Sequence, residues 1–330
     1  MADKTRPWVI ALEEHYWDSE VVSHFAGESR APNIVQRLED MDALRLKEMD
    51  EAGIDLQVIS HGPPGTQRLN PEIAAEVSIR ANDRLRDAIA ARPDRFAAFA
   101  SLPTVDPTAA ADELERTVTR LGFKGALIHG LTNGVFLDDK RFWPIFERAQ
   151  ALDVPLYVHP SSPHPAVVDI YYRDYLQDFP SLLGAGWGFT VETATQDIRL
   201  VLSGVFEEYP NLKIILGHLG ESLPFSLWRI DHAPPAPATS RSPSKRSSAT
   251  TSTSPPAATS PPPPSSARCW RWAPTASSSP SIGPSSRTRP AQSGWKACPS
   301  APRTRSRSSA PTPKGSSSSN VYQGPPGRGL

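Results

Sequence analysis

Val-Pro-Leu-Tyr-Val-His-Pro, residues 154–160, is an apolar run that ends in a histidine and is closed by a proline. The same layout recurs at residues 8–15, which end in Glu13, Glu14 and His15, and at residues 212–218, which end in His218. Each patch places a metal-capable side chain just past the carboxyl end of a short, buried strand. In a parallel α/β barrel these strand ends converge on one site.

Short apolar segments alternate with helix-like segments over the first two thirds of the chain. The strand candidates are residues 8–13, 54–60, 96–102, 122–128, 154–158 and 212–217. They are apolar without alternation, as expected for strands buried on both faces. The helix candidates are residues 40–52, 70–91, 107–121, 139–152 and 192–209. This order predicts an α/β fold with a parallel sheet, two strands short of an eight-stranded barrel.

The composition changes abruptly at Ala233. Residues 1–232 hold all 35 Asp and Glu and 22 of the 35 Lys and Arg, whereas residues 233–330 hold 13 Lys and Arg, 20 of the 36 prolines and no acidic residue. The second segment has one Ile, one Val and one Leu, too few to bury a core. We therefore divide the chain into an incomplete barrel, 1–232, and a disordered tail rich in Pro, Ser and Arg, 233–330.

Two explanations of the tail are open. A basic disordered arm could bind nucleic acid or acidic partners, but the change falls where the barrel still needs two strands. When the third base of each codon is joined to the first two of the next, residues 281–288 can encode Asp-Trp-Pro-Phe-Val-Glu-Asn, and residues 251–260 can encode Phe-Tyr-Val-Thr-Thr-Ser-Gly-Asn-Phe. We therefore hypothesise that the chain is an out-of-frame translation product from about Ala233. Stop codons between these segments in the alternative frame would contradict this hypothesis.

Several classes of protein are disfavoured by the sequence. Residues 1–7 are polar and have no apolar signal core. No apolar run approaches the roughly 18 residues that a membrane span needs. Both cysteines, Cys269 and Cys298, lie in the tail, so a disulfide framework in the body is excluded. We expect a cytoplasmic protein.

The side chains at the strand ends suit a transition metal. Glu13 and His15 are two residues apart, so they point to the same side of a strand. With His159 and His218 they form a mixed nitrogen and oxygen set, which fits Zn²⁺ or Mn²⁺ better than Ca²⁺. Glu221 is near enough in sequence to orient the His218 ring, as carboxylates do for metal-bound histidine. Each residue taken alone also fits an ordinary loop or surface position.

Other candidates carry two interpretations each. His129 ends a strand and either contacts a ligand or is a rim residue, and His61 ends another strand beside the rigid Gly62-Pro63-Pro64-Gly65 loop. Arg229 either forms a helix-surface ion pair with Asp231 or Glu221, or binds a substrate carboxylate or phenolate. Residues 187–189, Trp-Gly-Phe, could stack on an aromatic ring, although core packing is the simpler interpretation. The remaining histidines, His24, His164 and His232, are expected on the surface.

Together these motifs resemble those of the amidohydrolase-related metal-dependent decarboxylases. The group includes the γ-resorcylate, 2,3-dihydroxybenzoate, 5-carboxyvanillate and aminocarboxymuconate semialdehyde decarboxylases. The resemblance covers nearly all of residues 8–232. The matching segments are Ala-Leu-Glu-Glu-His (11–15), Ala-Asn-Asp-Arg-Leu (81–85), Arg-Pro-Asp-Arg-Phe (92–96), Leu-Gly-Phe-Lys-Gly (121–125), Pro-Leu-Tyr-Val-His-Pro (155–160) and Ile-Leu-Gly-His-Leu-Gly-Glu (215–221).

The resemblance implies a (β/α)₈ TIM barrel with one divalent metal, Zn²⁺ or Mn²⁺. It also implies non-oxidative decarboxylation of a phenolic or related unsaturated acid, and a homodimer or homotetramer. The implied metal ligands are Glu13, His15, His159 and His218; the implied catalytic residues are His218 and Glu221; the implied substrate contacts are His129 and Arg229. The alternative is a lactone or amide hydrolase of the same superfamily; a nucleic-acid partner and a membrane are not expected.

One expected member of the site is missing from the chain. The resemblance implies an Asp after the eighth strand that is both metal ligand and proton donor, but no Asp or Glu follows Asp231. Strands seven and eight are missing as well, and an open sheet leaves edges exposed. We therefore expect this polypeptide to fold poorly and to have impaired activity.

Overall fold

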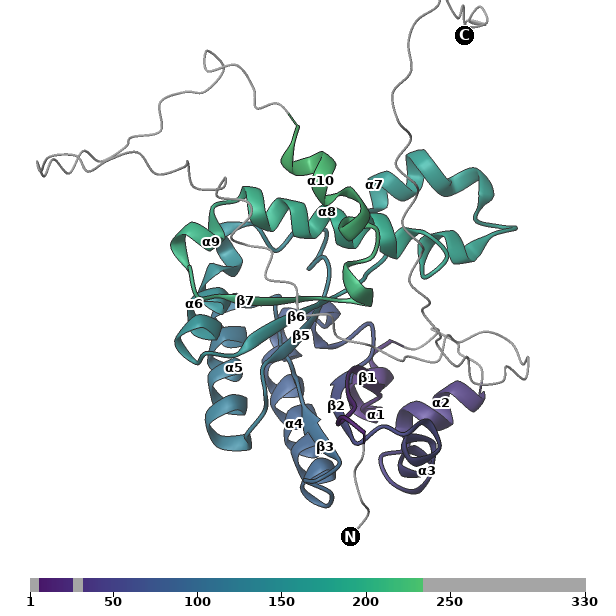
Figure 1. The fold of residues 1–330 in the computed structure, drawn as a ribbon, viewed down its shortest axis with the longest axis vertical. Coiled ribbons are helices and arrows are strands. Elements are labelled where there is room, and N and C mark those ends of the chain that lie inside the picture. The colour runs from purple at the N-terminus through teal and green to yellow at the C-terminus, as the bar shows by residue number, and fades with distance from the viewer. Residues whose placement is uncertain (1–5, 26–31, 234–330) are drawn as a thin grey trace, which may run out of the picture. The chain divides into compact units, whose positions relative to one another are not determined.

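The structure is a computed structural model that describes residues 6–25 and 32–233 (Figure 1). The expected tail and the hypothesis of a frame change fall on residues 234–330, outside the described residues. The expected boundary at residue 232 therefore stays a prediction. Within the described ranges, no helix is long and apolar enough to cross a membrane.

The strands are all parallel, as the apolar segments predict. They are β1 (Ile10–Tyr16), β2 (Leu56–His61), β3 (Phe96–Ala98), β4 (Ala100–Ser101), β5 (Ala126–His129), β6 (Pro155–His159) and β7 (Lys213–Leu216). Their order is β1-β2-β3 in one sheet and β4-β5-β6-β7 in another. Residues 96–101 serve both sheets, because Phe99 N donates to Ile59 O and Ala100 N donates to Gly125 O, each at 2.9 Å. All six predicted strand positions are therefore confirmed. Strands β1 to β7 together form one continuous curved layer, which is called the wall below.

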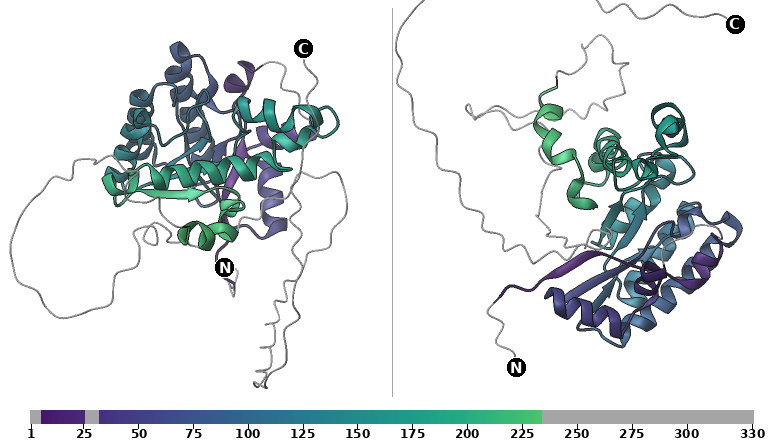
Figure 2. Two further views of the ribbon diagram at one scale, coloured as in Figure 1. Left: turned by 90° about the horizontal axis from the view of Figure 1, so that it is seen from above. Right: turned by 90° about the vertical axis from the view of Figure 1, so that its right-hand side faces the viewer.

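Helices alternate with these strands along the chain, and several of them pack against the wall (Figures 1 and 2). They are α1 (Ser19–Ser23), α2 (Pro32–Glu39), α3 (Ala43–Ala52), α4 (Pro71–Ala90), α5 (Pro107–Leu121), α6 (Trp143–Ala151), α7 (Pro165–Val167), α8 (Gly188–Leu202), α9 (Val205–Glu208) and α10 (Leu223–Asp231). Shorter turns are η1 (Thr66–Arg68), η2 (Lys140–Phe142), η3 (Val168–Tyr172), η4 (Arg173–Tyr175), η5 (Pro180–Leu183) and η6 (His218–Gly220). The predicted ends of α3 and α4 are confirmed: Gly53 ends α3 with φ 70°, and the Asn70 side chain caps α4 by accepting from Glu72 N.

Several predicted boundaries are wrong; for example, the strand predicted over 122–128 is β5, which begins only at Ala126. The segment predicted as one helix over 192–209 is α8 followed by α9, because Gly204 adopts φ 87° and interrupts the helix. The first strand continues to Tyr16 instead of ending at Glu13, with a register irregularity between Ala11 and Glu14. Glu13 and His15 therefore lie within β1 rather than past its end.

A small apolar cluster inside the wall leads up to the strand ends. Its buried members are Val58, Phe99, Leu127 and Tyr157. Side chains two residues apart on a strand share a face. The residue two places after each member of this cluster therefore also points to the inner side of the wall, nearer the carboxyl end of its strand. They are Ser60, Ser101, His129 and His159, so the strand pattern alone carries two histidines into one region.

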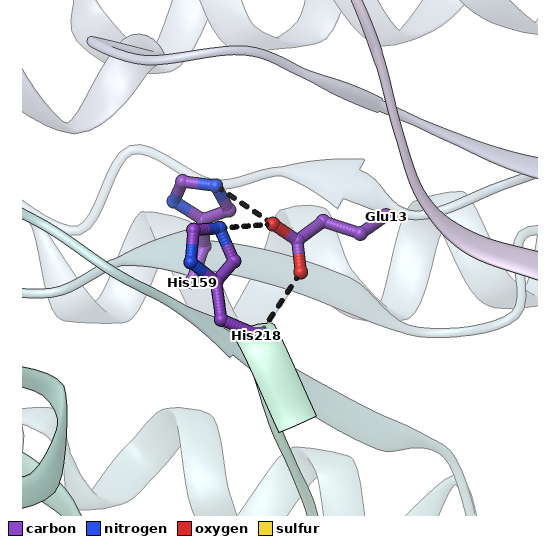
Figure 3. A group of neighbouring side chains, drawn as sticks. All are labelled: Glu13, His159 and His218. Carbon is purple, nitrogen blue, oxygen red and sulfur yellow. Dashed lines mark hydrogen bonds and ion pairs between the residues drawn. The ribbon is translucent and has the colours of Figure 1, made fainter. Parts of the chain in front are cut away.

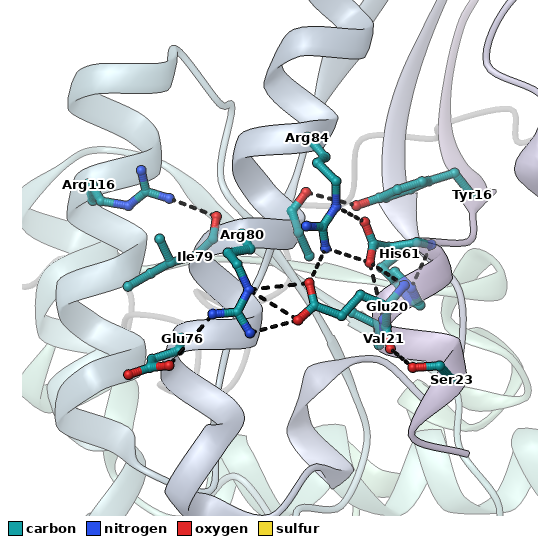
Figure 4. Close-up of polar contacts among 12 residues, drawn as sticks. Tyr16, Glu20, Val21, Ser23, His61, Glu76, Ile79, Arg80, Arg84 and Arg116 are labelled. Atoms are coloured by element: carbon teal, nitrogen blue, oxygen red, sulfur yellow. Dashed lines mark hydrogen bonds and ion pairs between the residues drawn. The ribbon is translucent and has the colours of Figure 1, made fainter. Parts of the chain in front are cut away.

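The loop after β1 is held to α4 by charged side chains (Figure 4). Asp18 caps α1 by accepting from Glu20 N and Val21 N, and Arg84 donates to both of its carboxylate oxygens at 2.7 and 2.8 Å. Burial raises the pKa of Asp18, but the hydrogen bonds from Arg84 and Val21 outweigh it, so the net shift is downward. Asp18 N also donates to His61 Nε2 at 3.1 Å, so this clamp reaches the carboxyl end of β2.

Candidate metal centre

Glu13 in the middle of β1 meets His159 at the end of β6 and His218 just after β7 (Figure 3). Glu13 Oε1 lies 2.7 Å from His218 Nε2 and 3.2 Å from His159 Nε2. One donor atom from each residue lies within 4.8 Å of the others. His15 Nε2 is 3.1 Å from His159 Nε2. The structure therefore brings together the four residues predicted from the sequence as metal ligands.

The Glu13 carboxylate is buried and oriented by two further donors. The Tyr157 hydroxyl and the His218 backbone N–H both donate to Glu13 Oε2. Burial raises the pKa of Glu13, but the hydrogen bonds with His159 and His218 outweigh it and hold the pKa well below its usual range. Sequence reasoning missed Tyr157. Its signal was its place two residues before His159, on the same face of β6.

His218 is held between two carboxylates. Its Nδ1 lies 2.7 Å from Glu221 Oε1, and Glu221 Oε2 accepts from Thr190 Oγ1 at 2.8 Å. Burial lowers the pKa of His218, but its contacts with Glu13 and Glu221 outweigh this and raise the pKa to about 9. The role expected for Glu221, orienting the His218 ring, matches this geometry.

The backbone around His218 makes this reach possible. His218, Leu219 and Glu221 all have positive φ, at 46°, 60° and 52°, a conformation that side chains with a Cβ rarely adopt. A Cβ on Gly217 would lie 2.7 Å from Val158 O. The glycine therefore lets β7 approach β6 closely enough for His218 to reach Glu13.

The predicted aromatic loop contributes one residue to the site. The Phe189 ring lies 6.0 Å from the His218 ring and 6.4 Å from the His159 ring. Trp187 is half-exposed. An apolar ring therefore borders the two histidines on the side of α8.

His15 is neutral and oriented by a hydroxyl. Its Nδ1 lies 3.3 Å from Ser60 Oγ. Burial and the neighbouring His159 lower the pKa of His15 to about 3. A neutral imidazole is the form that binds a metal, and His15 Nε2 lies 3.1 Å from His159 Nε2. Ser60 was also missed from sequence, because a serine at a strand end carries no specific signal.

His129 and His61 lie behind the cluster rather than at an open rim. His129 Nε2 lies 2.9 Å from His61 O, and His129 Nδ1 lies 3.1 Å from His159 Nδ1. The His61 ring contacts Asp18 N and Gly62 O. Burial lowers the pKa of both histidines. Both rings therefore bond to protein atoms.

Arg229 lies on the exposed surface of α10. Glu221, one of its expected ion-pair partners, contacts His218 and Thr190 instead. The predicted substrate contact of Arg229 stays a prediction. His24 and His232 are exposed as expected, and His164 is a partly buried cap of α7.

The model of the Amidohydrolase family matches residues 10–262, most of the chain. The chain belongs to this family. The γ-resorcylate decarboxylase of Polaromonas sp. is 44% identical over 233 residues, which are 68% of this chain and 70% of the relative. The expected superfamily is therefore confirmed.

Solved structures of the family have the same fold. A dihydroxybenzoic acid decarboxylase from Polaromonas sp., solved with manganese and 2-nitroresorcinol, is 42% identical with a TM-score of 0.65 over 73% of this chain and 74% of that one. A 5-carboxyvanillate decarboxylase from Novosphingobium aromaticivorans, solved with manganese and 4-hydroxy-3-methoxy-5-nitrobenzoic acid, is 34% identical with a TM-score of 0.64 over 69% and 70%. The amidohydrolase-type TIM barrel is the fold of the described residues.

The donor set of this chain fits a divalent metal. Glu13 supplies a buried carboxylate, and His159 and His218 supply ring nitrogens on the same side of it. One carboxylate and several imidazoles suit Zn²⁺ and Mn²⁺. The contacts of 2.7 and 3.2 Å between these atoms mean that one cation could contact all three donors.

Proposed function

We propose that this protein catalyses the metal-dependent, non-oxidative decarboxylation of a small phenolic carboxylic acid. The observation that carries the proposal is the meeting of Glu13, His159 and His218 in a chain 44% identical to a γ-resorcylate decarboxylase. Glu13, His15, His159 and His218 would hold one Mn²⁺ or Zn²⁺. When bound, such an ion supplies charge stabilisation and orients oxygen ligands.

The reaction requires one proton transfer and the cleavage of one bond. The ring carbon that bears the carboxylate accepts a proton, the bond to the carboxylate breaks, and its electron pair returns to the ring as carbon dioxide leaves. We propose that His218 and Glu221 hold a proton beside the site, because Glu221 contacts His218 Nδ1 at 2.7 Å. Phe189 gives an aromatic substrate an apolar neighbour next to the two histidines. The proposed role of Arg229 is to bind an anionic oxygen of the substrate.

We further propose that turnover by the chain as written is impaired. The family resemblance implies an acidic ligand after an eighth strand, and no Asp or Glu follows Asp231. General acid catalysis contributes typically 10²- to 10⁴-fold, so loss of the donor should lower the rate by about that factor. A frame-corrected chain should recover it.

The test is product analysis with 2,6-dihydroxybenzoate, using the 330-residue chain and a frame-corrected chain loaded with Mn²⁺. We expect carbon dioxide and resorcinol from the corrected chain and much slower release from the 330-residue chain. Hydrolysis of lactones or amides without loss of carbon would favour the hydrolase alternative. Carbon dioxide release by neither chain from any of a panel of phenolic acids would refute the decarboxylase proposal, and equal turnover would refute the impairment.

We also propose a homodimer or homotetramer in the cytoplasm. Large apolar side chains are exposed on the 165–191 segment and on α10, including Tyr171, Phe179 and Trp228. Exposed apolar patches often mark interfaces between proteins. Light scattering coupled to gel filtration tests the assembly, and cell fractionation tests the location.

A further inference from the structure

His129 is paired directly with His159 across β5 and β6. The two residues are register partners in the parallel ladder. Their rings lie 4.7 Å apart at 73°, and the two Nδ1 atoms are 3.1 Å apart. Each side chain is more than nine-tenths buried. Water is therefore excluded, and each ring nitrogen depends on a protein partner.

The partners of these nitrogens fix where the protons are. His129 Nε2 faces His61 O at 2.9 Å, and His159 Nδ1 faces Pro160 O at 2.7 Å. A carbonyl oxygen only accepts, so both of these nitrogens carry hydrogen. His129 Nδ1 must then be unprotonated, since a hydrogen there would point at the N–H of His159. His129 Nδ1 is thus a second acceptor for His159 Nδ1–H.

This assignment leaves Nε2 as the only variable position on His159. That atom lies 3.2 Å from Glu13 Oε1 and 3.1 Å from His15 Nε2. With Nδ1 holding the hydrogen, the Nε2 lone pair points at the place where the donors of the cluster meet. The opposite tautomer would place a hydrogen there and leave a lone pair facing two acceptors.

His129 is itself held rigidly from a distant segment. The Gln67 side chain donates to His129 O at 2.8 Å and accepts from His129 N at 2.7 Å. A Cβ on Gly65, which has φ 63°, would lie 3.0 Å from His129 Cδ2. The His129 ring therefore packs against the loop that joins β2 to η1.

We propose that His129 is a positioning residue: its Nδ1 joins Pro160 O in accepting from His159 Nδ1–H, and together they hold the tautomer and ring orientation that present His159 Nε2 to the metal. This role replaces the substrate contact expected for His129, because both of its ring nitrogens bond to the protein. The inference rests on the proposed metal site. It is consistent with the general finding that groups behind a metal-bound histidine tune it.

Two conservative variants separate the functions of the two His129 nitrogens. In His129→Asn the amide oxygen can stand where Nδ1 was, so it keeps an acceptor for His159. In His129→Gln the amide reaches toward the position of Nε2, so it keeps the donor to His61 O and loses that acceptor. His24→Asn and His24→Gln are matched controls, because His24 is exposed at the end of α1.

The readouts are Mn²⁺ affinity, from electron paramagnetic resonance of free Mn²⁺, and long-range ¹H–¹⁵N spectra of ¹⁵N-histidine in the metal-free full chain. We expect His129→Asn to bind within about threefold of the original chain and His129→Gln to bind 10- to 100-fold more weakly. In the spectra, only His129→Gln should lower the share of His159 in the Nδ1–H form, because Pro160 O then remains the single acceptor for that hydrogen. Equal affinity and an unchanged His159 tautomer in both variants would overturn the inference.

Failure of the proposed reaction gives a different result. If the original chain binds Mn²⁺ but releases no carbon dioxide from phenolic acids even after frame correction, the decarboxylase proposal fails. The difference between His129→Asn and His129→Gln would still support the positioning role. If the original chain binds neither Mn²⁺ nor Zn²⁺, the metal site and this inference both fail.

Discussion

Removing the Tyr157 hydroxyl should weaken metal binding without changing the ligand set. Tyr157→Phe deletes the O–H that donates to Glu13 Oε2, and it leaves the His218 backbone N–H, at 3.2 Å, as the remaining donor to that oxygen. Tyr157 and Glu13 are only 3% and 7% exposed, so water cannot readily replace the hydroxyl. The Glu13 carboxylate would then be held less firmly toward His159 and His218.

Two magnitudes follow from this geometry. A hydrogen bond to a charged group contributes about 1.5–3 kcal/mol, so the metal-free variant should lose about that much free energy of unfolding. Loss of a group that orients a metal ligand typically lowers affinity by 10- to 100-fold. Since tenfold is about 1.4 kcal/mol, binding should weaken by about 1.4–3 kcal/mol.

The assays are urea unfolding of the metal-free protein and Mn²⁺ titration by electron paramagnetic resonance. Tyr16→Phe is the matched control, because Tyr16 is also buried but donates to Ala81 O at 3.4 Å, away from Glu13. The control should lose about 1 kcal/mol of stability and bind Mn²⁺ normally. If Tyr157→Phe binds Mn²⁺ as tightly as Tyr16→Phe does, Tyr157 does not orient Glu13 for a metal and the reasoning fails.

Three further predictions concern stability. Burial raises the pKa of Asp197 to about 8, and neither carboxylate oxygen has a hydrogen-bond partner among the described residues. As the pH rises, Asp197 loses its proton in the unfolded chain before it does so in the folded chain. The free energy of unfolding should therefore fall by up to about 1.4 kcal/mol per pH unit between about pH 4 and 8. Asp197→Asn should remove this contribution from the slope measured by urea unfolding, while Glu14 and Glu192, whose pKa values burial also raises, keep theirs; an unchanged slope would contradict the prediction. Asp18→Ala removes a helix cap and the ion pair with Arg84, so calorimetry should show a loss of about 1–2 kcal/mol in the free energy of unfolding. This difference from the original chain should shrink as the pH falls through the lowered pKa of Asp18. A difference that stays constant with pH would count against the stabilising role of the Asp18 carboxylate. Mn²⁺ at about 100 times its dissociation constant should raise the free energy of unfolding by about 2.7 kcal/mol. A chelator should reverse this stabilisation, and His159→Ala should not show it. If Mn²⁺ still raises the melting temperature of His159→Ala, the ion binds elsewhere.

The strand ends were predictable because the signals are local. Apolar runs without alternation indicate parallel strands that are buried on both faces. A polar residue at the end of such a run therefore lies where the carboxyl ends of the strands meet. This reasoning placed His159, His129 and His61 directly after predicted strands, and the structure has them as the last residues of β6, β5 and β2. It also placed Glu13 and His15 on one side of β1, although the strand extends further than expected.

The supports of the site were not predictable in the same way. Gln67 holds the backbone of His129 from 62 residues away, and no pattern in the sequence links them. The turn at His218 depends on three residues with positive φ that are not glycine, which residue preferences argue against. The break at Gly204 within a predicted helix shows the reverse case, where one glycine overrides an otherwise helical segment.

The alternation of strands and helices, the residues at the strand ends and the donor types that suit a metal can all be read without a structure. These follow from periodicity and composition, which act over a few residues. The folded chain was needed to show that Glu13 meets His218, 205 residues away, and that His129 faces His159 rather than an open pocket. Those facts depend on strand register and on the curvature of the sheet, which arise from packing along the whole wall and leave no local trace.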